Sequence, residues 1–205
     1  MLIDKYKTLR NPAEAEIIIK KSRFIAVASP VNNEEEALHF IGQVEKKYSQ
    51  AKHNVFAYVI NEQIQRFSDD GEPSGTAGRP VLDVINRKGL VKVVIIVARY
   101  FGGILLGAGG LVRAYSEAAV KGIKAAGEAE RLLHQELTIV LDYHWLGMVK
   151  RETENAGVQN ITMEFGEKVG LKGFLRPDAL EALSKRLINI TAGQVIIKAG
   201  DFTYI

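Results

Sequence analysis

The chain has 205 residues, of which 47% are hydrophobic and 25% are charged, and its formal net charge is +3. These values are ordinary for a globular protein, and the length permits one large domain or two small ones. Cysteine does not occur, which excludes disulfides, a thiolate nucleophile and cysteine-based zinc sites. Residues 1–136 hold the whole positive excess, with 19 basic and 16 acidic side chains, but they form no dense basic run. Charge alone therefore does not predict nucleic-acid binding.

The N-terminal residues 1–19 mix acidic and basic side chains and lack the apolar core of a signal peptide. The longest uncharged stretch, residues 100–112, has 13 residues, and five of them are glycines. Such a stretch is too short and too rich in glycine to span a bilayer. We therefore expect a cytoplasmic protein without a membrane segment.

The first part of the chain alternates predicted strands and helices. Residues 16–31 are rich in β-formers, and Asn32 or Asn33 can cap the helix that follows, whose positive end suits Glu34. Periodicity and turn residues then predict strands at 53–60 and 64–67, a loop at 68–80, a short helix at 81–88, a buried strand at 91–98 and a helix at 109–126.

The last third of the chain follows a regular order. Residues 127–135 are polar and charged, which suggests a linker between a first domain at 1–130 and a second at 136–205. From residue 136 onward the patterns predict a strand, a helix, two strands that form a hairpin, a helix and a final strand. This βαββαβ order is that of the ferredoxin-like fold, so the sequence predicts an α+β protein.

The first candidate site is the segment D-D-G-E-P-S-G-T-A-G-R-P at residues 69–80. Its carboxylates, on Asp69, Asp70 and Glu72, could bind a hard cation. However, the spacing is not that of an EF-hand, and a loop whose side chains cap its own backbone is the favoured interpretation. Ser74 and Thr76 are possible nucleophiles, but they lack the surroundings of a nucleophile elbow. We expect no metal and no cofactor.

The second candidate site is the glycine-rich segment at residues 99–113, between the buried strand and the next helix. Glycines near a helix N-terminus expose backbone N–H groups that attract anions, and aromatic rings can stack on a base. The alternative is close helix–strand packing with the aromatic rings in the core, and both interpretations remain open. The residues concerned are Arg99, Tyr100, Phe101, Gly102, Gly103 and Arg113.

Two further groups complete the candidate surface. His53 opens a predicted strand and gains interest only if the fold brings it to the acidic loop, which also carries Arg79. The basic cluster Lys20, Lys21 and Arg23 suits a solvated strand edge better than a phosphate-contacting one.

Residues 69–82 resemble the motif D-D-G-E-P-x-G-T-A-G-x-P of the IMPACT family, and residues 97–115 resemble its motif R-Y-F-G-G-x-x-L-G-x-G-G-L-x-R-A-Y. The chain is thereby identified as a two-domain bacterial member of that family. The resemblance implies an N-terminal domain similar to domain 2 of ribosomal protein S5. It implies a C-terminal ferredoxin-like domain similar to the last domain of elongation factor G. Eukaryotic relatives regulate translation by binding the activator of a kinase that bacteria lack.

These similarities favour a translation-associated binding or regulatory protein that contacts the ribosome, RNA or a translation factor. The alternative is an enzyme that acts on a small anionic or phosphorylated substrate, with His53 and the acidic loop in acid–base roles. Fold analogy gives the enzyme little weight, so catalytic activity is uncertain and not favoured. The sequence does not determine the oligomeric state.

Overall fold

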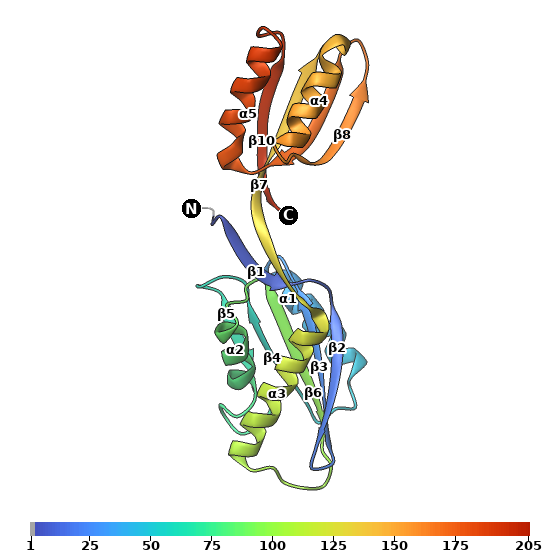
Figure 1. Ribbon diagram of the computed structural model, residues 1–205. Helices are drawn as coiled ribbons and strands as arrows, with labels where there is room; N and C mark the ends of the chain where they lie inside the picture. Colours follow the sequence, from blue (N-terminus) through green and yellow to red (C-terminus); the bar gives the residue numbers. More distant parts are fainter. Residues whose placement is uncertain (1–2) are drawn as a thin grey trace. The chain divides into compact units, whose positions relative to one another are not determined.

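The computed structural model describes residues 3–205, which fold into two compact units (Figure 1). The N-terminal unit comprises residues 6–130, and the C-terminal unit comprises residues 131–205 together with residues 3–5. Helices and strands are mixed in both units, which confirms the predicted α+β class. Over the described residues 3–205, none of the helices has the length and apolar character needed to cross a membrane.

The N-terminal unit is built on a five-stranded antiparallel sheet with the order β2-β3-β6-β4-β5. The strands are β2 (Ala13–Ile19), β3 (Ser22–Pro30), β4 (His53–Val59), β5 (Gln65–Ser68) and β6 (Val93–Tyr100). Helices cover both faces of this sheet, and the central strand β6 is therefore buried almost throughout. Its continuous apolar run reflects this double coverage.

Three helices form the outer layers of this unit. Helix α1 (Glu34–Lys47) covers one face, while α2 (Gly78–Arg87) and α3 (Ala108–Ala126) cover the other (Figure 1). Asn33 caps α1, because its side chain accepts a hydrogen bond of 2.8 Å from the backbone N–H of Glu36. Helix α2 begins three residues earlier than the pattern predicts, since the loop before it already organises its first turn.

The β2–β3 hairpin turns on two lysines. Ile19 pairs with Ser22, so Lys20 and Lys21 are the turn residues, with φ values of 46° and 66°. Side chains other than glycine cost about 1–2 kcal/mol each in this left-handed region. Tight hairpins normally place asparagine and glycine there. The two exposed lysines are therefore held where glycine would be the easier choice.

The C-terminal unit has the strand order β10-β7-β9-β8, which confirms the predicted ferredoxin-like plan. Its helices pack on one face of the sheet, around a core to which β7 contributes the fully buried Leu137, Ile139 and Leu141. The elements are β7 (Glu128–Leu141), a short 3₁₀ turn (Tyr143–Trp145), α4 (Leu146–Asn155), β8 (Gln159–Phe165), β9 (Val169–Leu175), α5 (Pro177–Ile190) and β10 (Ile196–Tyr204).

The boundary between the two units falls within the expected linker at residues 127–135, between residues 130 and 131, but these residues belong almost entirely to β7. The backbone N–H of Leu132 bonds to Ile205 and that of Leu133 bonds to Asp4, so both groups are paired as in a sheet. The pattern also missed β1 (Lys5–Leu9), which pairs with β7. Charged side chains on the exposed side of a paired strand produced the linker-like composition.

Candidate functional site

The loop that follows β5 is organised by a single carboxylate. Asp69 accepts hydrogen bonds from the backbone N–H groups of Gly75 (2.8 Å), Ala77 (3.1 Å) and Gly78 (2.8 Å). Gly78 is the first residue of α2, so Asp69 caps this helix from outside it. A Cβ atom at Gly78 would lie 2.5 Å from the carbonyl oxygen of Ser68, which explains the glycine there.

Glu72 turns inward from the same loop and joins the two motif segments. Its Oε1 atom lies 2.6 Å from Nη1 of Arg99 on β6 and accepts a hydrogen bond of 2.7 Å from the hydroxyl of Tyr115 on α3. The side chains of Arg99 and Glu72 are only 6% and 4% exposed. Burial, and then the hydrogen bond to Glu72, raise the pKa of the Tyr115 hydroxyl far above its usual range.

The sheet places the partners of this cluster side by side. Arg99 on β6 lies opposite Phe24 on β3 and opposite His53 on β4. The guanidinium carbon of Arg99 is 5.4 Å from the centre of the Phe24 ring, and that ring meets Tyr115 edge-on at 5.2 Å. The cation is therefore held between an aromatic ring and a carboxylate, inside the layer between the sheet and α3.

His53 is oriented by the backbone of the loop. Its Nδ1 atom lies 2.7 Å from the carbonyl oxygen of Asp70, and because a carbonyl only accepts, Nδ1 carries the hydrogen. Nε2 then faces Oε1 of Glu72 at 3.9 Å. The carboxylate of Asp70 accepts a hydrogen bond from the backbone N–H of Asn54, which ties the loop to β4 a second time.

These contacts favour a structural role for the acidic loop over cation binding. Asp69 and Asp70 accept hydrogen bonds from backbone N–H groups, and Glu72 is bound by Arg99 and Tyr115. Among residues 3–205, no group of three or more histidine, aspartate or glutamate side chains is placed to hold a metal ion. The loop is locked in place by its own carboxylates.

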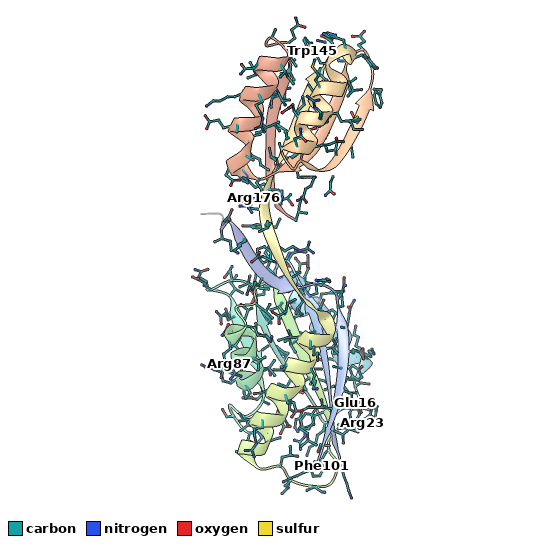
Figure 2. The ribbon with its side chains drawn as sticks, viewed as in Figure 1. Glu16, Arg23, Arg87, Phe101, Trp145 and Arg176 are labelled. Atoms are coloured by element: carbon teal, nitrogen blue, oxygen red, sulfur yellow. The ribbon has the colours of Figure 1, made fainter. Side chains whose placement is uncertain are left out.

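An exposed surface lies beside the buried cluster, at the end of the unit where the β2–β3 hairpin turns (Figures 1 and 2). Phe101 is 43% exposed, and the ammonium of Lys52 lies 5.3 Å from the centre of its ring. A Cβ atom at Gly102 would lie 2.0 Å from the carbonyl carbon of Lys21, so the hairpin turn and the glycine-rich segment are in direct contact. We call Lys20, Lys21, Lys52 and Phe101 the cationic tip.

The other predicted site residues are dispersed around this core. Ser74 and Gly103 are exposed, and Thr76 is buried with its hydroxyl bonded to the carbonyl of Pro73. Arg113 is exposed on α3. Arg79 pairs with Asp83 within α2, and Tyr100 lies beneath the guanidinium of Arg23 at 5.4 Å.

Two contributors were not identified as site residues from the sequence. Tyr115 belongs to the predicted core face of its helix, but its hydroxyl is a hydrogen-bond partner of Glu72. The available signal was chemical, since a buried tyrosine hydroxyl needs such a partner. No sequence pattern identifies Lys52 as a site residue, because its position beside Phe101 depends on the pairing of β4 with β6.

Comparison with known proteins agrees with this organisation. The Impact N-terminal domain matches residues 20–123, and a domain of unknown function, DUF1949, matches residues 139–194. The Bacillus subtilis protein "IMPACT family member YvyE" is 39% identical, and the match covers 100% of this chain and 95% of that protein. The Escherichia coli protein "IMPACT family member YigZ" is 31% identical, with coverages of 88% and 91%. A solved structure titled "Crystal structure of an hypothetical protein" matches with a TM-score of 0.65 and 29% identity, over 98% of this chain and 99% of that one.

Proposed function

The chain belongs to the IMPACT family, and from this premise we propose that it is a translation-associated binding protein that contacts ribosomes or structured RNA through the cationic tip. The single observation that carries the proposal is the exposed Phe101 ring with the Lys52 ammonium beside it and the lysine turn against Gly102. An exposed aromatic ring with a cation beside it is a combination that binds unpaired bases and phosphates.

The chemistry of the tip supports an anionic, base-containing partner. Stacking of one base on an aromatic ring contributes about 1–3 kcal/mol. Lysine side chains that contact phosphates release counterions, so binding of this kind weakens as salt rises. The positive φ values of Lys20 and Lys21 cost conformational free energy, which a hairpin turn with glycine at these positions would not cost.

The test is co-sedimentation of the full chain with ribosomes at stepwise salt concentrations. We expect weaker binding for Phe101→Ala. For the double change Lys20→Gln and Lys21→Gln, the slope of the logarithm of the binding constant against the logarithm of the salt concentration should become shallower by about 0.7–0.9 per lost phosphate contact. The matched control is Lys46→Gln with Lys124→Gln, which removes two exposed charges elsewhere. Co-sedimentation equal to that of an unrelated protein, or unchanged in the tip variants, contradicts the proposal.

Arg99, which the sequence suggests as a contact, is unsuitable for this test because it is buried against Glu72. Its reversal to glutamate would disrupt the fold of the unit. Arg113→Glu remains a useful third variant, since Arg113 is exposed on α3.

The enzyme alternative has less support. Glu72, the carboxylate that faces His53, is already bound by Arg99 and Tyr115 and is almost fully enclosed. A general base needs access to the proton it removes. A thermal-shift screen of nucleotides and phosphorylated metabolites, with and without Mg²⁺, tests this alternative, and ligand-dependent stabilisation that Asp70→Asn or His53→Gln abolishes would support it.

A further inference from the structure

A groove between α2 and α3 lies on the outer side of the N-terminal unit, away from the sheet. Its volume is about 440 Å³, within the range of roughly 300–1,000 Å³ typical of ligand sites. Both motif segments contribute to it, the first through Gly75 and Pro80 and the second through Val112, and Ser116 lies one residue beyond the second motif. The buried cluster and the cationic tip do not account for this groove.

Two arginines of α2 give the groove its charge. Nε of Arg79 donates to the carboxylate of Asp83 at 2.8 Å, and Nε of Arg87 donates to the carbonyl oxygen of Asp83 at 3.2 Å. Each guanidinium is thus tethered through Nε, while both side chains are exposed (Arg87 is labelled in Figure 2). The Nη groups of an arginine can bind a carboxylate with two parallel hydrogen bonds.

The spacing of the arginines defines what fits between them. Eight residues along a helix correspond to about 12 Å. An extended peptide covers about 3.3 Å per residue, so about four residues span the same distance. Val112, which is 37% exposed, lies in the groove and supplies an apolar surface.

We infer that this groove binds an extended acidic peptide segment of a partner protein, with two carboxylates about four residues apart and an apolar side chain between them. The carboxylates bind Arg79 and Arg87, and the apolar side chain packs on the exposed Val112. Asp83 pairs with Arg79, so the two arginines and one aspartate that line the groove leave one net positive charge there. Among the described residues that line the groove, none is aromatic, which disfavours a nucleic acid that would need a ring for stacking.

This inference does not rest on ribosome binding, since the groove and the cationic tip share no residue. The probe is a fluorescein-labelled peptide, Glu-Ser-Leu-Ser-Glu, titrated with the full chain and followed by fluorescence anisotropy. We expect saturable binding, an affinity about tenfold lower for Arg79→Gln or for Arg87→Gln, and a loss on Val112→Asp. The matched control is Arg151→Gln, an exposed arginine of α4, which should bind like the wild type.

Three results would overturn the inference. The first is the lack of measurable binding of the acidic peptide to the wild-type chain. The second is equal affinity in the arginine variants and the Arg151→Gln control, provided that circular dichroism shows all of them folded. The third is displacement of the peptide by an oligouridine at lower concentration than by unlabelled peptide, which would identify a nucleic-acid groove.

Discussion

The substitution Glu72→Gln is the most direct test of the buried cluster. It keeps the size of the side chain but removes the charge that faces Arg99, whose side chain is only 6% exposed. Removing one partner of a buried ion pair costs about 3–5 kcal/mol, because the remaining charge stays buried without compensation. This is a large part of the roughly 5–15 kcal/mol by which a typical domain is stable.

The assay can separate the two units, because the only tryptophan of the chain, Trp145, lies in the C-terminal unit. Urea unfolding followed by tryptophan fluorescence reports on that unit, whereas far-ultraviolet circular dichroism reports on both. With a slope of about 1–3 kcal/mol per molar urea, a loss of about 3–5 kcal/mol should lower the midpoint of the N-terminal unit by roughly 1–5 M. The fluorescence midpoint should stay unchanged.

A second substitution identifies the cause of the loss. Combining Glu72→Gln with Arg99→Met removes both charges, so the pair should lose less stability than the sum of the two single changes. Tyr115→Phe removes a hydrogen bond to a charged acceptor and should cost about 1.5–3 kcal/mol. A loss below about 1 kcal/mol for Glu72→Gln would refute the view that a buried charge pair holds the loop.

Three further predictions concern single groups of the N-terminal unit. Asp69→Ala should cost about 1–2 kcal/mol and speed hydrogen exchange at the N–H groups of Gly75 and Gly78, and unchanged exchange would contradict its capping role. Gly102→Ala should lower the melting temperature sharply because its Cβ would collide with the hairpin turn, whereas the control Gly109→Ala has open space and should not. Burial and the hydrogen bond to Glu34 raise the pKa of Tyr58 to about 12. The Tyr58 hydroxyl therefore stabilises the fold fully below about pH 10, the pKa of tyrosine in the unfolded chain, and this stabilisation is lost as the pH rises toward 12. Tyr58→Phe should reduce this loss in alkaline unfolding experiments.

Much of the fold was predictable because its signals are local. Apolar periodicity, capping residues and turn glycines identified the helices and most strands, and Asn33 caps α1 as expected. Strand β1 and the first part of β7 were missed for a physical reason. Their backbone groups bond to partners far away in the sequence, such as Asp4 to Leu133, which local composition does not reveal.

The site shows the same division between local and distant information. The sequence identified the two segments, and the structure joins them through Glu72, Arg99 and Tyr115. It did not indicate that Arg99 points into the protein, because the side-chain direction depends on the register of β6 with β3 and β4. Lys52 and Phe101, which strand pairing brings together, are the proposed surface contacts in place of Arg99.

The membership of residues 3–5 in the C-terminal unit has a consequence for synthesis of the protein. Asp4 pairs with Arg176, which follows it by 172 positions in the chain. At about 5–20 residues per second, a ribosome needs roughly 9–34 s to make the intervening segment. During that time Asp4 lacks Arg176 as its partner, while residues 6–130 can already complete their sheet. The N-terminal unit can therefore fold on the ribosome first, and the ion pair of the early segment forms only after Arg176 has been made.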